Sequence, residues 1–142
     1  MNHGSSAGAL IGETRDWATA RHNLPNAMPH VLGRGEAIED ILRDVREARL
    51  VSIVGAGGIG KTTVALAVAE RSLRSFDAGV WLVELAPLNK PSLVPNAIAA
   101  AVGLVVHSAD IMAALCRFLR DRDTLLVLDN CEHVVDAVGP CV

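Results

Sequence analysis

Aromatic side chains are scarce in this chain, whose 142 residues include two Trp, two Phe and no Tyr. The core must therefore be built from Ala, Val, Leu and Ile, which suits helices packed closely on a buried sheet. Cysteine is also scarce, and the three cysteines form an odd set without a CxxC pair. The sequence thus indicates neither a disulfide framework nor a zinc site, and we expect a reducing, cytoplasmic location.

A strong charge bias and a long apolar run are missing as well. Thirteen basic and sixteen acidic residues give a formal net charge of −3, and no basic stripe is visible. This balance argues against direct nucleic-acid binding. The most apolar run, residues 97–106, is too short to span a bilayer, and the N-terminus has no signal-peptide pattern. We therefore expect no membrane partner.

The overall composition, with 51% hydrophobic and 20% charged residues, is typical of one folded domain. Residues 1–30 are rich in Gly, Ser, Ala, Asn and Pro and show no sustained periodicity. Such segments are typical of connections, so we interpret residues 1–30 as a flexible N-terminal arm or linker. The folded domain is then expected over residues 31–142.

Short apolar runs alternate with amphipathic segments along this domain. Continuous apolar runs are typical of strands buried on both faces, and apolar positions spaced by three and four residues are typical of helices. Their alternation predicts an α/β fold, a parallel sheet covered by helices on both faces. We expect Ser108 to cap the fourth helix. The expected strands are residues 50–54, 80–85 and 125–128, and the expected helices are residues 36–48, 62–73, 91–102, 111–119 and, as a helical start, 131–138.

A glycine-rich loop lies between the first expected strand and the helix after it. Residues 55–62 match G-x-x-x-x-G-K-[ST], the pattern of a phosphate-binding loop. Glycines let successive backbone N–H groups turn toward phosphate oxygens at a helix N-terminus. We expect Lys61 to reach the β- and γ-phosphates, Thr62 to bind Mg²⁺, and Thr63 to contact the α-phosphate side. The other predicted nucleotide-binding residues of the loop are Gly55, Ala56, Gly57, Gly58, Ile59 and Gly60.

Two other interpretations of this loop stay open. One is a glycine turn that binds no ligand. The other is the GxGxxG fingerprint of an NAD-binding oxidoreductase domain, which Gly55, Gly57 and Gly60 also fit. Glu84 would then be the ribose-binding acid at the end of the second strand. A charge and two hydroxyls directly after the third glycine favour the phosphate loop, because the fingerprint needs an apolar, close-packed helix start there.

An acidic residue, Asp129, ends the third expected strand. Open α/β sheets bind ligands at the carboxyl ends of their strands, and hard cations such as Mg²⁺ prefer oxygen ligands. Asp129 is therefore a candidate metal ligand together with Thr62. The alternative is an exposed turn formed by Asp129 and Asn130. The glycine loop upstream favours the metal role.

The residues after Asp129 bear on hydrolysis. A carboxylate that activates water usually follows the metal-binding Asp directly, but Asn130 stands there and cannot accept a proton. Glu132 is the candidate base, or else it stabilises the first turn of a following helix. Asn130 and Glu132 are thus the candidate catalytic residues. We expect nucleotide binding with hydrolysis that is weak or absent.

Several of these segments together resemble a known family, the STAND-class P-loop ATPase domains. The similarity is greatest to the NB-ARC-like, AAA+-related domains of bacterial transcriptional regulators, and it covers about residues 22–138. Its most distinctive part is the sequence Asp-Asn-Cys-Glu-His that begins at Asp129. The segments that carry the resemblance are residues 23–25, 31–34, 50–63, 79–88 and 128–133.

The resemblance implies a switch that is gated by ATP and ADP and that signals to neighbouring domains. It places Leu32, Gly33 and Arg34 beside the adenine and ribose. It also implies a further strand between the phosphate-loop strand and the Asp129 strand. Residues 31–142 are then the N-terminal part of a P-loop NTPase-type domain that is C-terminally incomplete. A sensor arginine, a winged helix, helical repeats and a DNA-binding domain would belong to a longer parent regulator, and a truncated remnant that binds nothing is the remaining alternative.

Overall fold

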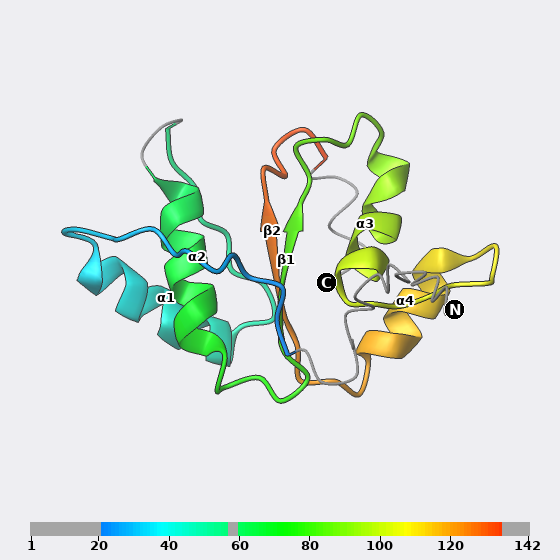
Figure 1. Ribbon diagram of the computed structural model, residues 1–142, viewed down its shortest axis with the longest axis horizontal. Helices are drawn as coiled ribbons and strands as arrows, with labels where there is room; N and C mark the ends of the chain where they lie inside the picture. Colours follow the sequence, from blue (N-terminus) through cyan, green and yellow to red (C-terminus); the bar gives the residue numbers. More distant parts are fainter. Residues whose placement is uncertain (1–20, 57–59, 135–142) are drawn as a thin grey trace, which may run out of the picture.

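The computed structural model describes residues 21–56 and 60–134. Figure 1 shows the two strands in the middle, with α1 and α2 on one side and α3 and α4 on the other. The expected α/β fold, with helices on both faces of a parallel sheet, is thereby confirmed. The elements in chain order are α1 (Gly35–Glu47), α2 (Lys61–Ser72), β1 (Val80–Glu84), the 3-10 helix η1 (Pro91–Leu93), α3 (Val94–Ala101), α4 (Ile111–Leu119) and β2 (Leu125–Asp129).

The sheet consists of β1 and β2, which pair in parallel from Val80↔Leu125 to Glu84↔Asp129. Alternate side chains of a strand point to opposite faces of the sheet. Val80 therefore packs with Leu66 and Ala69 of α2. Its neighbour Trp81 packs on the other face, in the cluster formed with α3 and α4, and is 5% exposed. Both faces are buried, which is why both strands are apolar at nearly every position.

The segment before α1 lies along the outer edge of β1. The N–H of Val80 donates to the carbonyl oxygen of Arg21 at 2.9 Å. The side-chain amide of Asn23 then makes two hydrogen bonds with the Leu82 backbone, donating to its oxygen (2.8 Å) and accepting from its N–H (2.6 Å). Gly79 makes this approach possible, because a Cβ at that position would collide with the Arg21 carbonyl.

These contacts divide the expected N-terminal arm, residues 1–30. Arg21 and Asn23 are hydrogen bonded to β1, His22 forms an isolated parallel bridge with Val80, and Leu24 is buried at 7% exposed. Residues 1–20 lie outside the described part of the chain. The placement of a domain boundary at residue 31 stays a prediction.

The strand expected over Leu50–Val54 does not form. Ile53 packs against the cluster of Ile38, Val64 and Val68 between α1 and α2, but Val54 is 86% exposed. A β-strand needs a neighbour for its N–H and C=O groups. Within the described residues the sheet has only the order β1–β2, so this segment has no strand beside it. The prediction from local composition was therefore wrong here.

The N-cap of α4 is Asp110 rather than the predicted Ser108. The Asp110 carboxylate accepts a hydrogen bond from the Ala113 N–H at 3.0 Å, as an N-cap side chain does. Ser108 lies two residues earlier, and its hydroxyl oxygen accepts from the Asp110 N–H at 3.2 Å. The last expected helix is described only at its start, where residues 132–134 form a turn.

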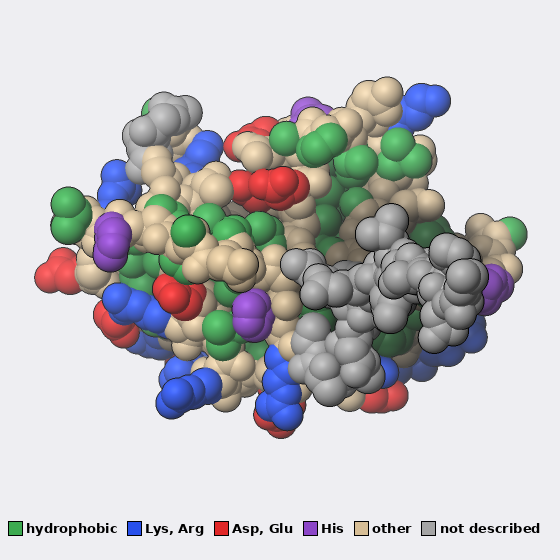
Figure 2. Space-filling view, viewed as in Figure 1, with side chains coloured by type: hydrophobic (Ala, Val, Ile, Leu, Met, Phe, Trp, Pro, Cys, Tyr) green, Lys and Arg blue, Asp and Glu red, His purple; other side chains and the backbone are tan. Residues whose placement is uncertain are grey.

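The surface carries charges of both signs. On the face shown in Figure 2, both basic and acidic side chains lie along the lower rim. None of the helices in residues 21–56 and 60–134 has the length and apolar character needed to cross a membrane.

Candidate functional site

The phosphate-loop lysine and threonine begin α2. Gly60 precedes them as N-cap with a φ of 81°, a left-handed conformation that residues with a Cβ rarely adopt. Lys61 and Thr62 are the first two residues of the helix. The start of α2 and the carboxyl ends of β1 and β2 lie at the same end of the fold (Figure 1). This end therefore combines a helix N-terminus, which favours anions, with the strand ends where α/β sheets bind ligands.

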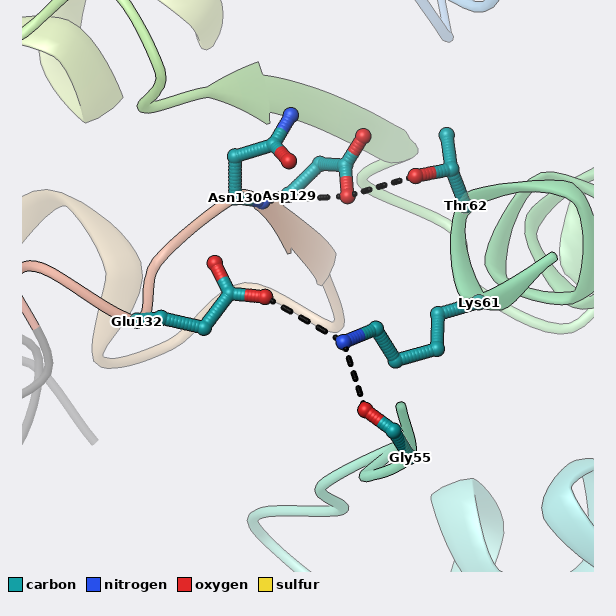
Figure 3. Close-up of polar contacts among 6 residues, drawn as sticks. All are labelled: Gly55, Lys61, Thr62, Asp129, Asn130 and Glu132. Carbon is teal, nitrogen blue, oxygen red and sulfur yellow. Dashed lines mark hydrogen bonds and ion pairs between the residues drawn. The ribbon is translucent and has the colours of Figure 1, made fainter. Parts of the chain in front are cut away.

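Asp129, the last residue of β2, contacts α2 directly. Its Oδ1 accepts a hydrogen bond from the Thr62 hydroxyl at 3.0 Å (Figure 3). The same oxygen accepts from the backbone N–H of Asn130 at 3.0 Å, and Asn130 has a φ of 55°. The two candidate metal ligands, 67 residues apart in the chain, are thus side by side.

The Lys61 side chain crosses toward the turn after β2. Its ammonium donates to the Gly55 carbonyl oxygen at 2.9 Å and forms an ion pair with Glu132, Nζ to Oε1 3.4 Å (Figure 3). The Lys61 side chain is 26% exposed and that of Glu132 is 68% exposed. One cation therefore joins the glycine loop to the segment that follows β2.

The pKa of Glu132 is lowered from the ordinary glutamate value. The largest cause is a hydrogen bond from the backbone of Glu132 itself, followed by the hydrogen bond and charge of Lys61. Both stabilise the ionised carboxylate. Glu132 is consequently an anion at neutral pH and is aimed at Lys61, whereas Asn130 makes no drawn contact with Lys61 in Figure 3.

The turn that carries Glu132 is fixed on both sides. The His133 ring donates from Nε2 to the Leu88 carbonyl oxygen at 2.9 Å, and Val134 is 2% exposed in the core cluster with α3 and α4. The Val134 N–H also donates to the Cys131 oxygen at 3.0 Å. Sequence reasoning missed this role of His133, because nothing in the local sequence indicates that Leu88 lies beside it.

The remaining predicted site residues belong to the glycine loop, to the first turn of α2 and to the segment before α1. Gly55 and Ala56 are exposed, Thr63 is half-buried, and Gly57, Gly58 and Ile59 lie outside the described residues. Leu32, which the family resemblance places beside the adenine and ribose, is 90% exposed. The residues after it, Gly33 (φ 71°) and Arg34, lead into α1. The roles of Leu32, Gly33 and Arg34 at a base stay predictions.

The described part of the chain holds no larger cluster of metal-binding side chains. Residues 21–56 and 60–134 contain no group of three or more His, Cys, Asp or Glu that could hold an ion. A metal at this site would therefore depend on Thr62, Asp129 and oxygens supplied by a ligand or by water. That donor set suits Mg²⁺, which keeps several waters and uses few protein ligands.

Comparison with known protein families decides the identity of the fold. The NB-ARC domain model matches residues 33–138. The chain belongs to the NB-ARC family. NB-ARC domains are nucleotide-binding modules, and the family match confirms the resemblance that the sequence indicated.

Two of the curated relatives that this chain matches are named as regulators. A putative HTH-type transcriptional regulator of Mycobacterium tuberculosis is 43% identical over 95 residues, 66% of this chain and 10% of the relative. Regulatory protein AfsR of Streptomyces griseus is 31% identical over 121 residues, 75% of this chain and 12% of AfsR. An uncharacterized protein of M. tuberculosis is 30% identical over 125 residues, 87% of this chain and 32% of that protein. The chain thus spans between about a tenth and a third of these relatives, and no solved structure matches it.

Proposed function

We propose that this NB-ARC domain binds ATP and ADP together with Mg²⁺ and serves as the nucleotide switch of a transcriptional regulator. The observation that supports the proposal most directly is the meeting of Lys61, Thr62 and Asp129 at one end of the sheet (Figure 3). Each comes from a segment that the sequence alone assigned to phosphate or metal. The contact between Thr62 and Asp129 is a tertiary property that local composition does not guarantee.

The phosphates would bind at the N-terminus of α2. Backbone N–H groups and the positive end of the helix dipole favour an anion there, and Lys61 supplies a full positive charge. The ammonium is a flexible point donor of three hydrogen bonds, so it can follow a phosphate oxygen. The loop residues Gly55 to Gly60 would complete the phosphate site.

The metal would be held by Thr62 and Asp129. Their oxygen atoms are 3.0 Å apart, so a cation bound to Thr62 would lie within reach of Asp129, directly or through a water. Mg²⁺ would supply charge neutralisation for the β- and γ-phosphates. The protein's own contribution is to position the two oxygens, which α2 and β2 do from opposite sides.

Hydrolysis by this chain is proposed to be weak or absent. Asn130, directly after Asp129, cannot accept a proton. The carboxylate with a candidate catalytic role is Glu132, and its Oε1 is engaged by the Lys61 ammonium at 3.4 Å. A general base must reach the attacking water in its proton-accepting form. A binding switch therefore fits the arrangement better than rapid turnover.

The signalling role is proposed from the relatives. One is named a putative HTH-type transcriptional regulator and another a regulatory protein, and both are far longer than the matched region. We propose that this domain acts in the cytoplasm, with DNA-binding, winged-helix and helical-repeat domains of a longer regulator as its partners. The nucleotide state would then be transmitted by contact with those domains.

The test is a titration of the chain with a fluorescent ADP analogue. Lys61→Ala should remove most of the affinity, because a hydrogen bond to a charged group is worth about 1.5–3 kcal/mol, or roughly a tenfold to hundredfold change. The matched control is Lys90→Ala, which removes the chain's other lysine at an exposed position ahead of η1. Equal affinity in wild type and Lys61→Ala, or preferential binding of NAD, would contradict the proposal.

The same titration with ATP tests the metal. In the wild type, adding Mg²⁺ should strengthen ATP binding. Asp129→Asn should remove that dependence and leave metal-free ADP binding nearly unchanged, because the substitution takes away only the charged oxygen that anchors the cation. The same Mg²⁺ dependence in both proteins would show that Asp129 is a turn residue without a metal role.

A further inference from the structure

In the ion pair between Lys61 and Glu132, a carboxylate of the protein itself contacts the ammonium group that is proposed to bind phosphate. Glu132 Oε1 lies 3.4 Å from Lys61 Nζ, although the two residues are 71 positions apart. The remaining drawn contact of the ammonium is the Gly55 carbonyl oxygen, which belongs to the loop itself (Figure 3). A phosphate oxygen and the Glu132 carboxylate are both anionic acceptors for the same group.

We propose that the Glu132 carboxylate competes with nucleotide phosphates for the ammonium of Lys61 and thereby lowers the nucleotide affinity of this domain. The inference rests on the proposed function, because it assumes that Lys61 binds phosphate. It assigns Glu132 a role opposite in sign to that of a binding residue. Removing the carboxylate should strengthen binding.

The competitor is held near its target by the fold. His133 donates to the Leu88 oxygen at 2.9 Å, and the Val134 side chain is buried against α3 and α4. These anchors flank Glu132 directly on its C-terminal side, and the Asn130 N–H bond to Asp129 fixes the turn on the other side. A carboxylate attached to a fixed turn has a high effective concentration at Lys61.

Burial decides how strong the competition is. The Glu132 side chain is 68% exposed, whereas that of Lys61 is 26% exposed. An exposed ion pair gains little net free energy, because water and salt screen it. Nucleotide can therefore displace Glu132, and the expected effect of removing the carboxylate is about a two- to fivefold gain in affinity.

The two alternative roles of Glu132 predict different results. A general base would leave ADP affinity unchanged when removed and would lower turnover. A carboxylate that stabilises only a helix start would lower the melting temperature without strengthening binding. A competitor raises the affinity for ADP. A gain in ADP affinity thus separates the competitor from the other two roles, and turnover and melting temperature separate those two from each other.

The experiment is titration of the whole chain with a fluorescent ADP analogue in the presence of a chelator, so that no metal contributes. Glu132→Gln should bind about two to five times more tightly than wild type. Glu132→Asp is the second variant, because its shorter side chain keeps the charge but loses the contact, and it should also bind more tightly. Melting temperatures of all variants verify that they are folded.

The control for net charge is Glu70→Gln. Glu70 is exposed on α2 nine residues after Lys61, about 14 Å along the helix axis, and should leave affinity unchanged. In a Lys61→Ala background, Glu132→Gln should no longer alter binding. Unchanged or weaker ADP binding by Glu132→Gln, or an equal gain in Glu70→Gln, overturns the competition proposal. If the wild type still binds ADP in a Lys61-dependent way, the proposed function stands. Absence of Lys61-dependent binding in the wild type overturns both.

Discussion

Two apolar segments of this chain, Leu50–Val54 and β2, have similar compositions, but only β2 forms a strand. β2 pairs with β1 along its whole length, and its residues pack against helices on both faces of the sheet. In Leu50–Val54, Ile53 reaches a core cluster, yet Val54 is 86% exposed and the segment has no strand beside it among the described residues. Hydrophobic composition selects segments that can be strands. Only a neighbour with free backbone groups makes one of them a strand.

The comparison can be tested most strongly with the same substitution in the paired and the unpaired region. Val80, at the start of β1, is fully buried. Val80→Ala should lower the free energy of unfolding by about 2–3 kcal/mol, from lost apolar burial and a cavity between β1 and α2. Urea unfolding with an unchanged m-value measures this effect. A loss below about 0.5 kcal/mol, the usual range for surface sites, would mean that the sheet is no better packed than the loop.

A second, smaller effect is expected where a side chain replaces a strand as the neighbour of β1. Asn23→Ala removes both amide hydrogen bonds to the half-buried Leu82 backbone and should cost about 1–2 kcal/mol. Asn26→Ala, an exposed asparagine of the same segment, is the matched control and should be neutral. Equal stabilities of the two variants in urea would show that the amide contributes nothing to the edge of β1.

The smallest effect is expected in the unpaired segment itself. Val54→Ala changes a side chain that is 86% exposed, so the free energy of unfolding should change by less than about 0.5 kcal/mol. Measured beside Val80→Ala, it gives the ratio between a paired and an unpaired valine. A cost similar to that of Val80→Ala would reveal that Val54 is buried in solution and would remove the contrast between the two segments.

The sequence predicts the helices well, because the spacing of their apolar residues reflects which side of each helix is buried. The helices begin and end close to their expected residues because each has an apolar side that packs on the sheet or on another helix. The prediction of a strand at Leu50–Val54 was wrong because strand pairing depends on residues distant in the chain. The predicted N-cap of α4 was wrong by two residues. Ser108 and Asp110 are both suitable N-cap residues, and only the backbone geometry shows which of them caps the helix.

The site was predictable in its residue types and only partly in its contacts. The loop motif and the acid after an apolar strand indicated Lys61, Thr62 and Asp129, and the structure brings Thr62 and Asp129 together at 3.0 Å. The Lys61–Glu132 ion pair had no local signal, because it depends on how the turn after β2 is held by Leu88 and by the core. The role of Asn23 was hidden for the same reason: its segment has no periodicity, and the amide acts on a strand 59 residues later.

The Asn23 amide also has a consequence for association between molecules. An uncovered edge strand offers its backbone groups to any other chain, which leads to domain swapping and aggregation. Asn23 occupies both backbone groups of Leu82, and Arg21 occupies the N–H of Val80 one pleat earlier. A foreign strand could join β1 only after this segment had been displaced. A few residues that look like a linker therefore also protect the protein against polymerisation through this edge.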